Sequence, residues 1–309
     1  MSHFQLLQLP NEIILLISDS LPMEDAVCAA LTCKRLFFLI FSRKVKLMRL
    51  QPSAKGMLLC RLEKDIIGVF YCHFNQKLMR FDSNGKSKAF TLWLIKSSQL
   101  RDGECASAAV KFISSAFMLC YYRARLVTNY QLLGPQHGIP PSSLSYVTPT
   151  FVIMPYLEHV CRKEAWAAKL IGDELFLSAT HKLFYDQVHA KALQSYLTSK
   201  SFYICKHMSV GLYYRKGDNI NLPAIDRNSA TDSNYYSTGS CRFCSTDWDA
   251  AIEWIGARHG WMVTITTYHD LGSCRSPFDR KWQAMARSHR RFAYRDAPSG
   301  IVKHKWIHG

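Results

Sequence analysis

The chain has 309 residues, of which 48% are hydrophobic and 13% aromatic, which argues against extended disorder and allows a small module plus a larger domain. Its apolar runs, such as residues 13–17 and 36–41, fall short of the roughly 20 residues that a membrane-spanning helix needs. The formal net charge of +16 favours acidic partners, whether proteins or nucleic acids.

Cysteine usage and the N-terminal residues indicate the compartment. The 11 cysteines are an odd number spread over the whole length, which is typical of buried thiols or metal ligands in a reducing compartment rather than of disulfides. No basic stretch precedes an apolar one at the N-terminus, so no signal peptide is expected. We therefore expect an intracellular protein, cytoplasmic or nuclear, that does not enter the membrane.

The N-terminal segment predicts a first helix that begins at Pro10 and ends before Pro22. Proline suits the first turn of a helix, and Glu12 complements the helix dipole there. Apolar side chains at helical spacing share one face of this helix, namely Ile13, Ile14, Ile17 and Leu21. The residue before a proline is pushed out of the helical region, which ends the helix.

Two more short helices are expected within the same segment. Pro22 opens the second, whose body at residues 26–31 is small and apolar. Thr32 is expected to cap the third, which is apolar nearly all round over residues 33–41. So small a module buries too little surface to be stable alone, so its apolar excess must be covered by the rest of the chain or by a partner.

The order and spacing of these residues resemble the F-box motif. The matching segments are Leu9-Pro10-x-Glu12-Ile13, Leu21-Pro22-x-Glu24-Asp25 and Leu31-x-Cys33-Lys34-Arg35-Leu36. The resemblance implies a helical module that binds an acidic Skp-type adaptor, and through it a cullin, by filling a groove between adaptor helices. The contact positions that it implies are Leu9, Pro10, Ile13, Ile17, Leu21 and Pro22. The alternative is a helical hairpin that packs only on its own domain.

The rest of the chain predicts a mixture of helices and strands. The patterns favour a helix over residues 57–65, a strand over 69–72, a long helix within 106–131, a strand over 201–206, a loop over 215–240 and a short helix over 279–287. Gly172-Asp173 lies between two apolar segments, and a pair with glycine first is typical of a type II′ hairpin.

The clearest strand signal is a hairpin with alternating residues over 248–254 and 261–267. The predicted fold class is α+β, with a small N-terminal three-helix F-box module followed by helices packed on a mostly antiparallel β-sheet. We expect the module at residues 1–50, a client-binding domain at 57–285 and a loose basic C-terminal tail at 286–309. No repeats with periods of roughly 20–50 residues are present, which disfavours leucine-rich and propeller architectures.

The region beyond the module also resembles a fungal F-box family with a characteristic C-terminal region. The matching segments are residues 62–73 (LEKDxxGxFYCH), 133–140 (LGPxHGIP), 173–177 (DELFL), 204–207 (ICKH), 241–247 (CxxCxTD) and 271–279 (LGxCRSPxD). In the family pattern a further Cys-x-x-Cys begins at Cys72, but Asn75 and Met79 occupy the other positions here. Cys72 is therefore expected to be a buried thiol. The resemblance does not name a client.

A second Cys-x-x-Cys pair predicts a zinc site. Cys241 and Cys244 have the spacing that lets two thiolates bind one zinc ion. Cys205 and His207 are expected to supply the other half, since residues two apart in a strand face the same way. Four protein ligands leave no open coordination position, so the zinc would be structural. The alternative is that these four residues lie in or near a sheet without metal.

No zinc-protease, nucleophile-elbow or phosphate-loop motif occurs in the sequence, so independent catalysis is not expected. Ser273 and Cys274 lie near His269 and Asp270 in sequence and could imitate a nucleophile with its base, although a loop after a strand explains them equally well. We predict a non-catalytic F-box receptor that supports ubiquitin transfer by holding an unknown client close to the charged enzyme.

Two other hypotheses remain open from the sequence. The first is a basic nucleic-acid-associated factor with structural N-terminal helices, which the charge favours but which lacks a zinc-finger, helix-turn-helix or aromatic RNA-binding signature. The second is a stray enzyme or metal-binding domain. Steeply salt-dependent binding would distinguish the first of these from an F-box receptor.

Overall fold

The computed structural model divides into two compact units, residues 1–88 and residues 89–309. The structure describes residues 8–41, 52–82, 109–111, 117–148, 152–154, 157–185, 202–210, 219–220, 235–256, 260–286 and 297–309. The basic cluster at residues 43–49 and most of the loop predicted over 215–240 lie outside the described residues. No helix in the described segments is long and apolar enough to cross a membrane.

The first unit begins with the short helices that the sequence predicts. Its elements are α1 (Asn11–Ser20), α2 (Met23–Thr32), α3 (Lys34–Leu36), the π-helical turn η2 (Phe37–Phe41), α5 (Pro52–Asp65), β1 (Val69–Cys72) and β2 (Lys77–Arg80). Pro10 and Pro22 occupy the N-cap positions of α1 and α2, and acidic residues lie in both first turns. The third helix is capped by the Cys33 sulfur, which accepts a hydrogen bond from the Leu36 N–H, and not by Thr32 as predicted.

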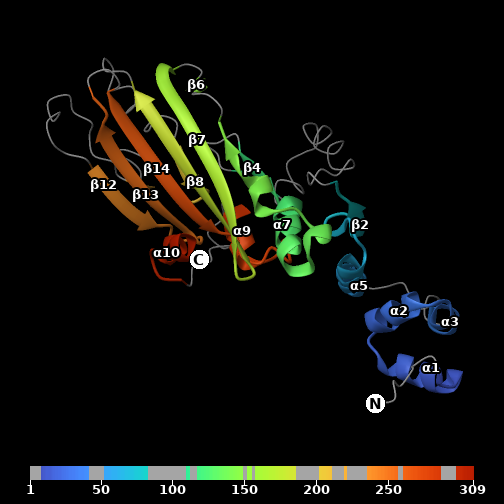
Figure 1. Ribbon diagram of the computed structural model, residues 1–309. Helices are drawn as coiled ribbons and strands as arrows, with labels where there is room; N and C mark the ends of the chain where they lie inside the picture. The colour runs from blue at the N-terminus through green and yellow to red at the C-terminus, as the bar shows by residue number, and fades with distance from the viewer. Residues whose placement is uncertain are drawn as a thin grey trace. The chain divides into compact units, whose positions relative to one another are not determined.

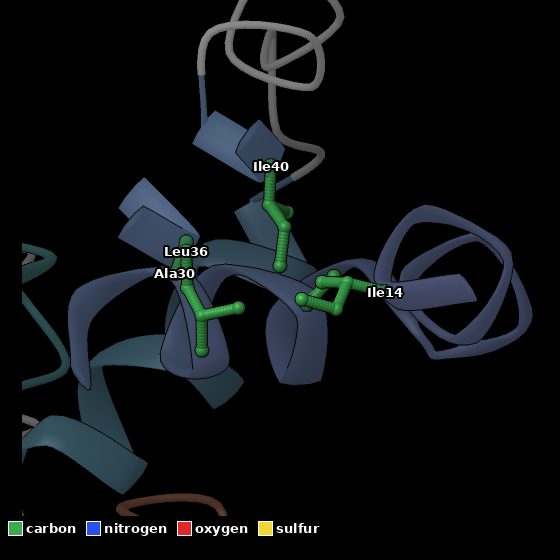
Figure 2. Packing of buried hydrophobic residues seen from close by; sticks show 5 residues of the cluster. Ile14, Ala30, Leu36 and Ile40 are labelled. Carbon is green, nitrogen blue, oxygen red and sulfur yellow. The ribbon is translucent and has the colours of Figure 1, made fainter. Parts of the chain in front are cut away.

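A small hydrophobic core joins these helices (Figure 2). Its buried members come from α1, α2, α3 and η2, and are Ile14, Ala26, Ala30, Leu36 and Ile40. Ala26 and Ala30 have no exposed surface, and their small side chains let the neighbouring helices approach α2 closely. The core is too small to cover every apolar residue of the three helices, which leaves α1 with an apolar outer face.

The β1–β2 hairpin follows α5 in the same compact unit. All four residues of β1 are buried, and the buried Glu63 of α5 accepts a hydrogen bond from the Tyr71 N–H. Asn75 Nδ2 lies 3.4 Å from Cys72 Sγ and 3.5 Å from Met79 Sδ. Cys72 is therefore a buried free thiol, as predicted.

The second unit is built on a seven-stranded sheet whose paired strands all run antiparallel (Figure 1). Its strands are β5 (Tyr146–Val147), β6 (Val152–Met154), β7 (Leu157–Ile171), β8 (Glu174–Tyr185), β12 (Tyr235–Ser240), β13 (Thr246–Trp254) and β14 (Trp261–Asp270). The strand order is β12-β13-β14-β8-β7-β5, and β6 also pairs with β7. The predicted β13–β14 hairpin is confirmed. The hairpin at Gly172 is confirmed too, with a φ of 63° at the glycine.

Smaller elements complete this unit. They are β3 (Ala109–Lys111), β4 (Met118–Cys120), α7 (Tyr121–Leu133), η5 (Pro135–His137), η6 (Pro141–Leu144), β9 (Phe202–Cys205), β10 (Met208–Val210), β11 (Asn219–Ile220), α9 (Arg280–Ala286) and α10 (Ile301–His308). Strands β9, β10 and β11 form a separate three-stranded sheet. The α+β class predicted from the sequence is confirmed.

Three local predictions differ from the structure. The helix predicted within residues 106–131 begins only at Tyr121, as α7, because the residues before it include the paired strands β3 and β4. The loop predicted over 215–240 ends in β12, an edge strand that pairs with β13. The C-terminal tail contains α10, whose Val302 packs against Phe176 and Tyr268 of the sheet. Strand pairing and sheet packing, which local patterns do not reveal, explain all three.

The division between the compact units also lies elsewhere than the sequence suggested. We expected the second domain to begin near residue 57, but α5 and the β1–β2 hairpin belong to the compact unit that ends at residue 88. The reason is packing, since α5 contacts α2, β1 and β2.

Candidate functional site

Helix α1 turns one face towards the small core and another towards solvent. Ile14 is 3% exposed and packs inward (Figure 2), whereas Ile13, Leu16 and Ile17 keep 41%, 66% and 39% of their surface exposed. Residues three and four apart are neighbours on a helix, so these three side chains form one apolar strip. We call Ile13, Leu16 and Ile17 the α1 strip.

The predicted adaptor positions are solvent-exposed with one exception. Pro10, Ile13, Ile17, Leu21 and Pro22 are exposed. Leu9 is half-buried and packs against the helical core, so its role is partly structural. Leu16 and Phe38 are also exposed, by 66% and 70%, and neither is among the predicted contact positions. The three-residue spacing of Leu16 from Ile13 predicts that the two side chains are neighbours on the helix.

Arg35 fixes the segment that leads into α1. Its Nη2 donates to the backbone carbonyl of Leu9 at 3.0 Å and to the side-chain oxygen of Asn11 at 2.7 Å. One guanidinium therefore joins α3 to the first residue of α1 and to the residue before Pro10. The start of the helix that carries the exposed apolar side chains is therefore tied to α3.

A second candidate site lies in the other unit, where the four predicted metal ligands converge. The ligand atoms of Cys205, His207, Cys241 and Cys244 all lie within 4.8 Å of one another. Zinc–sulfur bonds of about 2.3 Å in a tetrahedral site would place two sulfurs about 3.8 Å apart. The cluster can therefore accommodate a metal ion after shifts of at most about 1 Å. We call these four residues the Cys/His cluster.

Two tight turns from two different sheets supply the Cys/His cluster. Cys205 ends β9 and His207 lies in the two-residue turn before β10, so the prediction that the pair shares one strand face is wrong. Cys241 and Cys244 occupy the turn between β12 and β13. Lys206 donates to the carbonyl of Ala286 at the end of α9, which anchors the first turn.

The electrostatics of the cluster suit a cation. Burial raises the pKa of the Cys205 and Cys244 thiols above its ordinary value. Hydrogen bonds from Cys205 and from Cys244 lower the pKa of Cys241 below its ordinary value. His207 Nδ1 lies 4.0 Å from Cys205 Sγ, and its buried Nε2 has no hydrogen-bond partner among the described residues. A soft divalent cation would neutralise thiolate charge and use the imidazole.

Backbone and side-chain groups surround two of the sulfurs. The Phe243 N–H donates to Cys241 Sγ at 3.3 Å. Thr246 Oγ1 lies 3.2 Å from Cys244 Sγ and 3.0 Å from His269 Nδ1. Burial lowers the pKa of His269 to about 3, so this imidazole is neutral near pH 7. Thr246 is therefore a part of this site that the Cys-x-x-Cys spacing does not predict.

The nucleophile-and-base arrangement considered for residues 269–274 is not formed. His269 Nδ1 faces Thr246. Cys274 is fully buried, and its Sγ contacts the carbonyl oxygens of Leu271 and Gly272. Burial raises the pKa of this thiol well above its ordinary value, which is the opposite of what a nucleophilic cysteine needs. Ser273 Oγ lies near Asp279.

Comparison with known proteins identifies the N-terminal helices. Residues 6–45 match the family model for F-box-like domains. No curated protein and no solved structure matches the chain. The match includes α1, α2, α3 and η2, the elements that carry the α1 strip and its core. The resemblance of residues 62–279 to a fungal F-box family and its C-terminal region stays a prediction. The chain is thus a protein with an F-box-like domain at its N-terminus.

Proposed function

We propose that this protein is a substrate-receptor subunit of a cullin-type ubiquitin ligase. Its F-box-like helices bind a Skp-type adaptor, and the adaptor joins it to the cullin. The second unit binds a protein client that the sequence does not name. The chain itself performs no chemistry and supports ubiquitin transfer by proximity.

The exposed α1 strip is the observation that carries this proposal. Three large aliphatic side chains lie exposed on one strip of a ten-residue helix, within the residues that match the F-box-like family, and such a strip is suited to a partner surface. A groove between two helices of a partner can take up such a strip, with side chains at positions i, i+3 and i+4 as anchors. The net charge of +16 suits an acidic adaptor.

Co-purification tests the adaptor step. The wild-type chain is expressed with a Skp-type adaptor beside the double variant Ile13→Ser plus Ile17→Ser, whose changes lie at exposed positions. Leu132→Ser is the matched control, since Leu132 is a leucine of α7 with 46% exposure in the other unit. We expect the wild type and Leu132→Ser to retain the adaptor and the double variant to lose it. Wild-type protein that does not bind the adaptor would overturn the proposal.

We also propose that the Cys/His cluster holds one structural zinc ion. Three thiolates and one imidazole are a donor set that zinc prefers, and complete protein ligation leaves no position for a reacting water. The ion would join the β9–β10 turn to the β12–β13 turn and so connect two sheets of the client-binding unit. A reducing intracellular compartment, cytoplasmic or nuclear, would keep these thiols available as ligands.

Elemental analysis tests the zinc proposal. We expect about one zinc per purified chain, and a lower content in Cys244→Ser. Cys274→Ser is the control, since Cys274 is an equally buried thiol that contacts backbone carbonyls rather than the cluster. Zinc content near zero in the wild type, or equal content in all three proteins, would refute the assignment.

A further inference from the structure

A short chain of polar contacts leads from the Cys/His cluster into the sheet. Cys244 Sγ lies 3.2 Å from Thr246 Oγ1, which lies 3.0 Å from His269 Nδ1. Thr246 and His269 are direct partners in the β13–β14 ladder, so strand pairing fixes their separation. All three residues have no exposed surface, so water does not compete for these contacts.

When metal is bound, the chemistry of the groups decides which atom donates and which accepts in each of these contacts. A metal-bound thiolate carries no proton and can only accept a hydrogen bond. The single proton of the Thr246 hydroxyl is then given to Cys244, and the hydroxyl oxygen is left as an acceptor. A neutral imidazole with its proton on Nδ1 supplies the matching donor. The Met285 sulfur, 3.4 Å from Thr246 Oγ1, is a competing acceptor for this proton, but an uncharged thioether accepts more weakly than the nearer, negatively charged thiolate at 3.2 Å.

We infer that Thr246 and His269 are positioning residues of the proposed zinc site: His269 donates from Nδ1 to Thr246, and Thr246 donates to the Cys244 thiolate. Groups that hydrogen-bond to metal ligands orient them and tune their affinity for the ion. The Phe243 N–H makes the corresponding contact to Cys241, and the His207 N–H makes it to Cys205. This inference rests on the zinc proposal and names residues that lie outside the four ligands.

Zinc affinity measured by competition with a chromophoric chelator tests the role of Thr246. Thr246→Val keeps the shape of the side chain and removes the hydroxyl. Thr267→Val is the matched control, because Thr267 is a buried threonine of the same sheet whose hydroxyl meets the Ala179 carbonyl. We expect Thr246→Val to bind one zinc with roughly 10- to 100-fold lower affinity and Thr267→Val to match the wild type. Equal affinity in all three proteins would overturn the inference and leave the zinc proposal intact.

The tautomer of His269 gives a second readout that needs no stable Thr246 variant. Nitrogen-15 NMR of the zinc-loaded wild type distinguishes a proton on Nδ1 from one on Nε2, and the signal is assigned by its loss in His269→Gln. We expect the proton on Nδ1. A proton on Nε2 would reverse the hydrogen-bond direction and refute the inference, whereas wild-type protein without zinc would refute the zinc proposal instead.

Discussion

The guanidinium of Arg35 lies 2.7 Å from the side-chain oxygen of Asn11 and 3.0 Å from the backbone carbonyl of Leu9. We expect Arg35→Ala to weaken adaptor binding several-fold, because the start of α1 would no longer be tied to α3. A hydrogen bond of this kind contributes about 0.5–1.5 kcal/mol. Adaptor affinity is measured by calorimetry, with the exposed neighbour Lys34→Ala as control. Equal losses of adaptor affinity in both variants would show that the positive charge matters, and not the hydrogen bonds from Arg35 to the start of α1.

Substitutions at two adjacent isoleucines of α1 distinguish an effect on folding stability from an effect on adaptor binding. Ile14 lies in the helical core (Figure 2), so Ile14→Ala should lower the free energy of unfolding of this unit by about 2–5 kcal/mol. Ile13 is 41% exposed, so Ile13→Ala should change stability by less than about 0.5 kcal/mol and still weaken adaptor binding. Denaturant unfolding and adaptor affinity are measured on both variants. Equal effects of the two changes on stability would contradict the assigned faces of α1.

A carboxylate from the sheet caps the C-terminal helix. Asp247 Oδ2 accepts from the N–H groups of Val302 and Lys303 at 2.8 and 3.0 Å, which replaces the side chain that Gly300 lacks at the N-cap. We expect Asp247→Ala to lose about 1–2 kcal/mol and Asp247→Asn to lose less, because it keeps an acceptor oxygen. Hydrogen exchange of residues 301–308 should accelerate in the same order. Unchanged exchange in Asp247→Ala would show that packing alone holds α10.

A buried group makes the second unit sensitive to acid. His181 lies 3.4 Å from Glu164 Oε2 and 3.2 Å from Arg162 Nη2, and burial lowers its pKa. The folded state binds this proton less well than the unfolded state, whose histidine has a pKa near 6.5. Stability is therefore full above about pH 6.5 and falls as the pH drops below it, by up to about 1.4 kcal/mol per pH unit.

The variant His181→Gln isolates this contribution, because Gln does not titrate. Denaturant unfolding is measured at pH 7 and pH 5 on the wild type and the variant. We expect the wild type to lose more stability than His181→Gln over this interval. Equal losses would assign the acid sensitivity to other groups.

Local patterns predicted the helical module well, because its signals are contiguous. Pro10 and Pro22 mark the starts of α1 and α2, and the spacing of the isoleucines marks an apolar face. The pattern did not show which isoleucine would turn inward. Ile14 became core and Ile13 became surface only when α1 packed against α2 and η2.

The Cys/His cluster shows a different limit. Its four ligands were predicted from spacing and from a resemblance, but the reason given for Cys205 and His207 was wrong, since a two-residue turn and not a strand face presents His207. Thr246 is only two residues from Cys244, but no local pattern shows that its hydroxyl faces that sulfur, and His269 is brought to Thr246 only by the β13–β14 register. The helix α10 was missed because its anchor, Asp247, lies on a strand far from it in sequence.

By itself the sequence determined the F-box-like helices, the β13–β14 hairpin and the two Cys/His pairs, since each of these depends on residues that are close along the chain. Only the tertiary structure decided which apolar side chains stay exposed, which turns meet at the cluster and which residues surround its sulfurs. Burial and strand pairing bring distant residues together, and their outcome depends on competition among all parts of the chain rather than on any one segment.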